Sequence, residues 1–483
     1  MKLLSYLMLS VASVGSPARL YTFHHENVLG TSLEFKALAA DEAAAQRAER
    51  AALDEIDRLN KILSGYDAES EFSRWARTHG GAVRVSPELF AVLGQFDAWQ
   101  TRTNGALDAA AETVTRVWKQ AAREQRVPTS QELASAVALV KQPHWRLDVA
   151  SRTATHLSDA PLMLNSFAKS YIVDKAAGAA MATGALKGVV VNIGGDLVAR
   201  GDWNEPVRVA DPRADGENGP ALAELTLRDR AVATSGGYRR GVTIAGKHYS
   251  HIVDPRTGRP ADEILSATVA ARDAATAGAL ATAFAVLPLN ESVRLAQAVA
   301  ADVDYLMVDR SGRRVTSPRW AGLAAAAQPG TALATGEVAI ELELARISDG
   351  RYRRPYVAVW VEDKDKFPLR TVALWLEKTR WLPDLKSWYH SDRMRSMAEG
   401  KDITGSVSSA TRPPGKYTLR WDGKDQAGAL VKPGKYTICI EAAREHGTYQ
   451  VIRQEIDFGG ASKQFTLPGG TEIATIAVDY RKK

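Results

Sequence analysis

The chain has 483 residues, of which 45% are hydrophobic, 24% charged and 7% aromatic. These proportions are typical of a folded protein of two or three domains and exclude a mainly disordered, collagen-like or coiled-coil chain. The 62 Lys and Arg residues barely outnumber the 56 Asp and Glu residues, and they form no long basic run. A nucleic-acid partner is therefore not expected, whereas the slight basic excess suits an anionic small ligand.

The first residues have the pattern of an export signal. Lys2 precedes an apolar stretch over residues 3–14, which is shorter than the roughly 20 residues that span a membrane. Ser16 and Ala18 supply small residues for a cleavage site. We therefore expect a signal peptide over residues 1–18 and a periplasmic protein that is not membrane-spanning. The alternative is a buried first helix or strand.

The cysteine content excludes several structural and metal-binding features. Cys439 is the only cysteine, which excludes an intrachain disulfide and a cysteine-based metal cluster. A lipoprotein anchor would need a cysteine near residue 20, and the sequence has none there.

Helical patterns dominate the chain up to Gly184. Apolar residues recur at helical spacing, and Ser86-Pro87 is a typical helix start. The expected helices cover 39–63, from Ser86-Pro87 to Asn104-Gly105, 108–123 and 169–183.

Strand patterns begin at residues 188–193, a β-branched run that ends in Gly194-Gly195 and predicts a buried strand with a tight turn. The mixture of helices and strands predicts an α+β body. The later elements expected in it are strands near 205–210, 222–234, 242–253 and 265–271, helices at 273–287 and 290–301, and a closing hairpin at 305–308 and 314–316.

The composition changes at residues 321–336, which are small and low in complexity and are interpreted as a linker. The linker divides a domain over 19–320 from a second over 337–483. In the second domain apolar residues alternate with period two, and Pro-Gly pairs interrupt the chain, which predicts an all-β Ig-like sandwich. We expect its tryptophans to pack in the core: Trp360, Trp375, Trp381, Trp388 and Trp421.

Glycine-rich turns are the first candidate ligand sites. Gly194-Gly195 allows a ligand close to the backbone because no Cβ intervenes. The segment 235–238 (SGGY), followed by Arg239 and Arg240, offers N–H groups and cations to a phosphate. Both patterns are also compatible with ordinary loops.

His251 is a candidate general base, because an imidazole titrates near neutrality. A metal triad of His248, His251 and Asp254 is disfavoured, since this spacing would place successive members on opposite faces of a strand. A purely structural role for the histidine is the alternative.

In their order along the chain, these motifs resemble the ApbE family, whose members are flavin transferases. The most specific blocks read N-I-G-G-D and H-I-V-D-P-R-T-G. The matching blocks are Leu29-Gly30-Thr31, 64–74, 103–108, Ala168-Lys169-Ser170-Tyr171 with Asp174, 192–196, 235–238, 251–258 and 279–283.

The resemblance implies an α+β flavin-transferase-like body that transfers FMN from FAD to a threonine of an acceptor protein, with release of AMP. It also implies Mg²⁺ at the pyrophosphate and an electron-transfer protein with an S/T-G-A-T motif as acceptor. By match, His251 would be the base, and Asp254 would orient it or hold its loop. Ser166 and Thr282 would bind the metal. The residues implied to contact FAD are Leu29, Tyr66, Ala106, Leu107, Asp108, Lys169, Asn192, Gly194, Gly195, Asp196, Ser235, Gly236 and Tyr238.

Two positions depart from the family pattern. Met163 replaces an Asp that usually contacts FAD, and Gly278 replaces the Asp that is a principal metal ligand. Because Mg²⁺ prefers charged oxygens, Gly278 removes both a ligand and a charge. An alternative function is therefore a non-catalytic periplasmic flavin-binding or redox-partner protein with a degraded metal site. A purely structural interaction protein is a third interpretation.

The second domain has resemblances of its own. Residues 415–436, with a W-D-G-x-D turn, resemble the Ig-like domain of flagellar hook-capping proteins. The whole segment also resembles an uncharacterised periplasmic domain found beside ApbE proteins. Residues 407–411 (VSSAT) are close to the S-G-A-T acceptor motif, so Thr411 is a candidate self-acceptor. A Ser/Thr-rich turn is the alternative.

Overall fold

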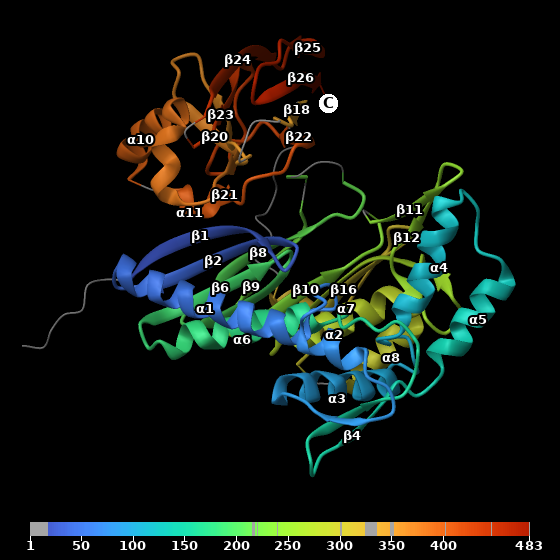
Figure 1. Ribbon diagram of the computed structural model, residues 1–483. Helices are drawn as coiled ribbons and strands as arrows, with labels where there is room; N and C mark the ends of the chain where they lie inside the picture. The colour runs from blue at the N-terminus through green and yellow to red at the C-terminus, as the bar shows by residue number, and fades with distance from the viewer. Residues whose placement is uncertain are drawn as a thin grey trace, which may run out of the picture.

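The computed structural model describes residues 18–482, apart from 215–217, 220, 239, 300–301, 324–335, 348–351, 401 and 446. The predicted signal peptide, except Ala18, lies outside the described residues, as do Arg239 and most of the predicted linker. The described chain forms two bodies, one on each side of residues 324–335 (Figure 1).

An eight-stranded sheet, antiparallel at every pairing, forms the centre of the first body (Figure 1). The expected α+β class is confirmed by this sheet and the helices against it. In spatial order the strands are β1 (Arg19–Val28), β2 (Thr31–Ala39), β6 (Leu186–Ile193), β7 (Asp196–Gly201), β10 (Ala231–Ser235), β15 (Ile264–Ala271), β16 (Asp304–Asp309) and β17 (Arg314–Thr316).

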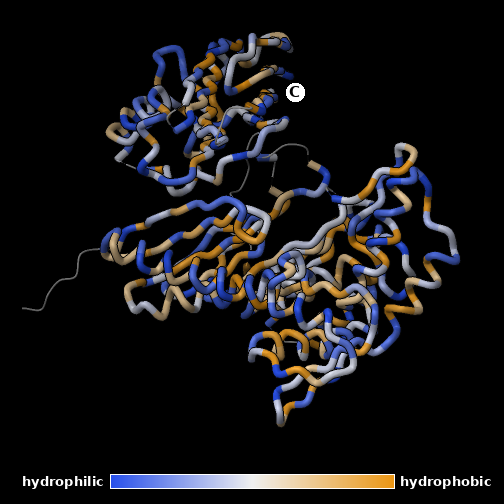
Figure 2. Tube along the Cα trace, in the orientation of Figure 1, coloured by the Kyte–Doolittle hydropathy of each residue, from blue (hydrophilic) through white to orange (hydrophobic). Residues whose placement is uncertain are grey.

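Three long helices cover one face of this sheet: α1 (Glu42–Leu63), α6 (Ala168–Ala182) and α7 (Ala274–Val286). Their ends follow from the sequence. Asp41 caps α1 by accepting the Ala44 N–H at 2.7 Å, and Gly184 follows α6 in a left-handed conformation with φ of 68°. Figure 2 shows hydrophobic residues along the strands and the helices packed on them. This face therefore holds the main core.

The opposite face of the sheet has a smaller core. Val190, Leu197 and Leu306 point into it from the sheet, and Leu225 and Trp320 cover them. The covering elements are the hairpin of β8 (Glu205–Ala210) and β9 (Ala221–Leu227) and the short helix α9 (Trp320–Leu323).

Peripheral elements surround this sheet and its helices. Among the described helices, none combines the length and apolar character that a membrane span requires. The remaining elements are α2 (Glu71–Ala76), α3 (Pro87–Arg102), α4 (Ala111–Arg123), α5 (Ser130–Val140), α8 (Leu289–Val299), the sheet of β3 (Ala82–Arg84), β5 (Thr153–His156) and β4 (Trp145–Asp148), and the hairpins β11 (Gly241–Ile244) with β12 (Lys247–Ser250) and β13 (Val253–Asp254) with β14 (Arg259–Pro260).

Two segments expected as single strands are divided by turns. The segment near 222–234 contains β9 and β10, separated at Asp229, whose φ is 47°. The segment near 242–253 contains β11, β12 and the start of β13, with Ala245 and Gly246 at positive φ between the first two. Two successive residues at positive φ form a tight hairpin turn, which the alternation of side chains alone does not reveal.

The second body is a sandwich of two sheets with a shared buried core, as expected. Four of the five tryptophans are buried, and Trp381 is half-buried. The sheets are β22 (Gly415–Trp421), β18 (Gly336–Leu344), β26 (Ile473–Lys482) and β25 (Lys463–Leu467), and β21 (Ser408–Ser409), β20 (Pro368–Trp375), β19 (Tyr356–Glu362), β23 (Gly434–Ala443) and β24 (Tyr449–Phe458).

The sandwich also carries helical segments that the all-β expectation omitted: η1 (Thr379–Asp384), α10 (Lys386–Glu399) and α11 (Thr404–Val407). Leu382 and Trp388 pack on the outer face of the five-stranded sheet. Trp388, Ser391 and Arg395 are buried on one face of α10 at a spacing of three and four residues, and Gly400 ends the helix with φ of 66°.

The sandwich lies against β1, the edge strand of the large sheet (Figure 1). The His24 N–H donates to the Glu377 carbonyl at 3.1 Å, and His24 Nε2 lies 3.1 Å from Ser408 Oγ. An ion pair between Arg354 and Glu26 at 2.9 Å extends the contact. The open edge of the sheet is thereby covered.

His24 should make this contact sensitive to acid. Burial above all, and then the nearby Lys36, His25 and Arg412, lower the pKa of His24 from 6.5 to about 3. The unfolded chain therefore binds a proton that the folded chain excludes, so the stabilisation is fully present above pH 6.5 and is lost as the pH falls towards 3.

Urea unfolding followed by tryptophan fluorescence tests this expectation on the wild type and His24→Gln. Between pH 6 and 4 the free energy of unfolding should fall more steeply in the wild type, by up to about 1.4 kcal/mol per pH unit. Parallel pH dependences in the two proteins would contradict the assignment.

Candidate functional site

A cavity of about 1150 Å³ opens beside one end of the large sheet. Its walls come from the β1–β2 and β6–β7 turns, the end of β10, the beginning of α6 and one side of α7. Segments far apart in the sequence therefore line one cavity. Its volume is slightly larger than that of most small-molecule binding sites.

Most of the residues expected in a site do line this cavity. Three do not: Asn192, Gly195 and Asp254. Those that do are Leu29, Tyr66, Ala106, Leu107, Asp108, Ser166, Lys169, Gly194, Asp196, Ser235, Gly236, Tyr238, His251 and Thr282.

The β6–β7 turn brings backbone close to the cavity. Gly194 has φ of 57°, and a Cβ there would lie 2.6 Å from Thr31 Cγ2, so only glycine fits. Asn192 supports the turn, since its Oδ1 accepts the Gly195 N–H at 3.1 Å. Asn192 and Gly195 therefore shape the turn, and Gly194 contributes to the wall.

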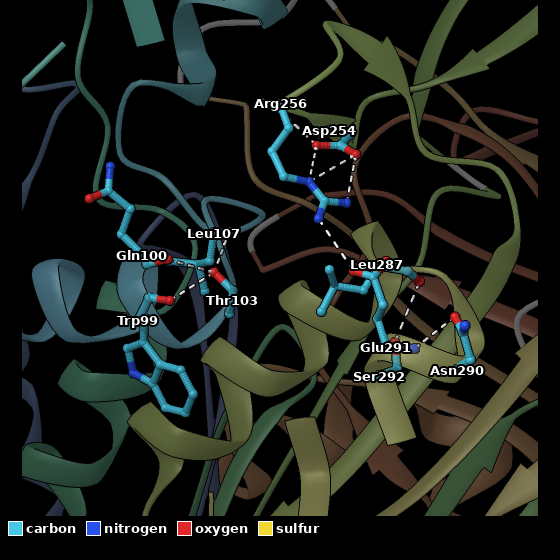
Figure 3. A network of polar contacts seen from close by, with 10 residues as sticks. All are labelled: Trp99, Gln100, Thr103, Leu107, Asp254, Arg256, Leu287, Asn290, Glu291 and Ser292. Atoms are coloured by element: carbon cyan, nitrogen blue, oxygen red, sulfur yellow. Dashed lines mark hydrogen bonds and ion pairs between the residues drawn. The ribbon is translucent and has the colours of Figure 1, made fainter. Parts of the chain in front are cut away.

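The loop before α4 is held by its own hydrogen bonds. Thr103 Oγ1 accepts the Leu107 N–H at 3.0 Å (Figure 3). The Asp108 carboxylate accepts hydrogen bonds from the Ala110 N–H at 2.7 Å and from the side-chain amide of Gln100 at 2.6 Å. The carboxylate of Asp108 thus fixes the loop, which presents Leu107 to the cavity.

Tyr66 offers an aromatic surface at the cavity. It is 81% exposed, and its hydroxyl oxygen accepts a hydrogen bond from Asn165 Nδ2 at 2.7 Å. The nearby Met163 packs against Gly65, where a Cβ would lie 2.5 Å from the sulfur. Position 163 thus presents a thioether to this part of the wall.

His251 has a defined hydrogen-bonding arrangement at the cavity wall. Its Nδ1 lies 3.0 Å from the Arg240 carbonyl, and because a carbonyl only accepts, Nδ1 carries the proton. In the neutral ring Nε2 then has a free lone pair. Desolvation is the main cause that lowers the pKa of His251 below 6.5, and the charges of Arg240 and Lys119 act in the same direction. The ring is therefore neutral at pH 7.

Asp254 is directed at Arg256 (Figure 3). The Asp254 carboxylate accepts from Arg256 Nε at 3.0 Å and from its terminal nitrogen at 2.9 Å. Arg256 also reaches Glu291 on α8 at 3.4 Å, and the Gly258 carbonyl accepts the Trp118 indole N–H at 2.9 Å. Of the two roles expected for Asp254, the geometry gives it that of holding the loop.

Cationic groups gather at the cavity. Among the described residues that line it, they are Lys119, Lys169 and Arg240, and Arg239 lies outside the described residues. Lys169 Nζ lies 3.5 Å from Asp196 Oδ1 and donates to the Gly194 carbonyl at 3.4 Å. The sequence interpretation missed Lys119, although the spacing of Glu112, Thr115 and Lys119 predicts one face of α4.

The expected metal site has two oxygens close together. Thr282 Oγ1 donates to the Ser166 carbonyl at 3.0 Å, so both groups lie at the cavity as anticipated. Both are neutral, and position 278 supplies no carboxylate. A Cβ at Gly278 would lie 2.1 Å from Ser170 Oγ.

This donor set does not fit Mg²⁺, which favours charged oxygens. Among the described residues, no group of three or more His, Cys, Asp or Glu side chains is arranged to hold a metal ion. The Asp196 carboxylate also lines the cavity, but Ser170 and Lys169 already contact it.

Thr411, the candidate self-acceptor, does not line the cavity. It is only 4% exposed, and its hydroxyl has no hydrogen-bond partner within the described part of the chain. An acceptor hydroxyl must be exposed, so this threonine would react only after a local opening of the sandwich.

Two family models match the chain. That of the ApbE family matches residues 29–307, and that of a family described as "Predicted periplasmic protein (DUF2271)" matches residues 337–475. The resemblance of residues 415–436 to the hook-capping Ig-like domain is not confirmed.

Relatives named FAD:protein FMN transferase match the first body. The one from Vibrio cholerae is 30% identical over 264 residues, which are 53% of this chain and 78% of the relative. The one from Treponema pallidum is 29% identical over 316 residues, 60% of this chain and 85% of the relative.

Solved structures agree in fold. The ApbE protein of Thermotoga maritima aligns with a TM-score of 0.57 at 25% identity, over 64% of this chain and 100% of its own. The flavin transferase ApbE from Vibrio cholerae aligns with a TM-score of 0.54 at 24% identity, over 64% and 100%.

The contact between Gly278 and Ser170 leads to a stability prediction. Gly278→Ala should lower the free energy of unfolding by about 1–3 kcal/mol, because the new methyl group overlaps the Ser170 hydroxyl. Because Ser170→Gly removes the overlapping hydroxyl, the double variant should be less destabilised than the sum of the two single variants. Urea unfolding measures both.

Gly178→Ala, on the exposed side of α6, is the matched control. No atom lies within 4 Å of a Cβ at this position. This change should stabilise the protein by about 0.5–1 kcal/mol, since alanine is the better helix former. If Gly278→Ala has the same effect as the control, the close contact is not present.

Proposed function

The chain belongs to the ApbE family, and we propose on this premise that it is a periplasmic FAD:protein FMN transferase. It would move FMN from FAD to a threonine hydroxyl of an acceptor protein and release AMP. The observation that supports this most strongly is the neutral His251 at the wall of a cavity built from the family's sequence blocks. We also propose the division into an FAD-binding domain over 19–320, a linker and a second domain over 337–483.

FAD would occupy the cavity with its rings against the apolar wall. Leu29, Leu107 and the exposed ring of Tyr66 offer surfaces for the flavin or the adenine. The backbone at Gly194 and Gly236 would face the pyrophosphate, and both positions require glycine because a Cβ would collide with neighbouring protein atoms. Ser235, Tyr238 and Asp196 would complete this wall, and Lys169 would supply positive charge.

The transfer requires one proton acceptor and one leaving group. The threonine oxygen attacks the phosphorus on the FMN side of the pyrophosphate, and a new P–O bond forms. The bond from that phosphorus to the bridging oxygen breaks, and this oxygen leaves with AMP. The hydroxyl proton passes to His251 Nε2, the nitrogen left free by the hydrogen bond of Nδ1 to Arg240. Asp254 holds the loop that carries the imidazole.

Mg²⁺ was expected from the resemblance, with Ser166 and Thr282 as its ligands. Bound there, it would neutralise phosphate charge during the transfer. The donor set lacks the necessary carboxylate, so the proposed step depends only on groups of this chain.

The acceptor proposed is an electron-transfer protein with an S/T-G-A-T motif. Its threonine must enter the cavity beside His251, which favours a flexible exposed segment. The sandwich, whose family is described as periplasmic, would help such a protein to dock.

A gel assay of flavin fluorescence tests the function. The full-length protein is mixed with FAD and a small acceptor domain that carries the S-G-A-T sequence, and a fluorescent acceptor band is expected. His251→Asn should slow the transfer by about 10²–10⁴-fold, because it removes the general base. Binding of FAD should change little.

The pH profile provides an independent readout. Because His251 acts in its neutral form and partial desolvation at the cavity wall lowers its pKa, the acid limb of the transfer rate should lie below pH 6.5. A limb at or above 6.5 would contradict the assignment of the base.

The missing carboxylate at position 278 favours one second candidate, a flavin-binding protein without transferase activity. FAD binding with no labelled acceptor would support that function. A band on the protein itself that persists in Thr411→Ala would point to an acceptor elsewhere in the chain.

A further inference from the structure

Helices α6 and α7 approach each other most closely at Ser170 and Gly278. Ser170 is only 1% exposed, and an added Cβ at Gly278 would lie 2.1 Å from its Oγ and 2.9 Å from its Cβ. The hydroxyl of Ser170 thus fills the space that any side chain at position 278 would need. A carboxylate at 278 and the serine at 170 exclude each other.

The serine has a second contact, which faces the cavity. Ser170 Oγ donates to Asp196 Oδ2 at 2.6 Å, and Asp196 Oδ1 lies 3.5 Å from Lys169 Nζ. One oxygen of Asp196 is thereby occupied by a hydroxyl, and the other faces an ammonium group. This carboxylate is satisfied by its own chain and is not a free ligand for a cation.

The Lys169 ammonium group is accessible to an anion in the cavity. Its side chain is about one-third exposed, it lines the cavity, and its contacts with Asp196 and the Gly194 carbonyl are long. A phosphate oxygen would form a stronger, charge-assisted hydrogen bond with the ammonium group. Lys169 therefore supplies a positive charge in the same cavity whose two neutral oxygens make a poor metal site.

We propose that this chain binds the pyrophosphate of FAD without a divalent cation. The Lys169 ammonium takes the place of the metal, and the Ser170–Gly278 pair keeps a metal-binding carboxylate out. This inference rests on the proposed function for the identity of the ligand. It adds that both FAD binding and flavin transfer proceed without Mg²⁺.

A titration of full-length protein with FAD, in excess EDTA and in excess Mg²⁺, tests the proposal without any need for transfer. The quenching of flavin fluorescence reports binding. In the wild type the dissociation constant should differ by less than about twofold between the two conditions, which is under 0.5 kcal/mol. Lys169→Met should weaken binding by about ten- to hundredfold, as expected for the loss of a hydrogen bond from a charged group.

Lys175→Met is the matched control. Lys175 is on the same helix, but it is exposed and lies over the ring of Tyr171 instead of lining the cavity. It removes the same charge from α6 and should leave the dissociation constant within about twofold of the wild type.

The double variant Ser170→Gly with Gly278→Asp tests whether a carboxylate at position 278 makes FAD binding depend on Mg²⁺. It removes the clash that Gly278→Asp alone would create, and it places a carboxylate beside Thr282 and the Ser166 carbonyl. Its affinity for FAD should become at least about tenfold higher in Mg²⁺ than in EDTA. Ser170→Gly alone, which adds no carboxylate, should gain less affinity from Mg²⁺ than the double variant.

The outcomes separate this inference from the proposed function. A wild type that binds FAD only with Mg²⁺ would overturn the inference and leave the transferase intact. Binding in both conditions without transfer to any acceptor would uphold cation-independent binding of FAD and refute the transferase. No binding in either condition would refute both.

Discussion

The contact between α6 and α7 at Gly278 sets the geometry of the site. α7 is buried along nearly its whole length against the sheet, and its many alanines permit this depth. At Gly278 the absence of a side chain leaves room for Ser170. Because both helices also line the cavity, a change at their crossing alters the position of the groups that face the ligand.

Strand β1 connects this site to the second body. Its outer edge hydrogen-bonds to the chain at Glu377, while Asn27 at its end and Leu29 in the following turn line the cavity. Arg354 of the sandwich contacts both Glu26 and Asn27. Burial raises the pKa of Glu26 to about 7, although Arg354 opposes the shift. The sandwich is thus in direct contact with a wall of the cavity, so an acceptor docked on it would be held near the flavin.

The sequence predicted those features that depend on local signals. Ser86 caps α3 by accepting the Leu89 N–H, and the turn at Gly194 follows β6, both as expected. Most of the site residues expected from the motifs also line one cavity. Lys119 was missed because it belongs to no motif, and its approach to His251 depends on how α4 packs. α10 was missed because its buried face includes the polar residues Ser391 and Arg395, which an apolar pattern does not reveal.

Position-by-position comparison of motifs treats Gly278 as a simple loss. The structure shows instead that Gly278 and Ser170 are two halves of one contact, although the two residues are far apart in the sequence. The Ser170 hydroxyl fills the space beside Gly278 and pairs with the buried Asp196 carboxylate, so a side chain at position 278 would disturb both contacts. The crossing of α6 and α7 therefore holds Asp196 in place, and the other oxygen of Asp196 faces the Lys169 ammonium group.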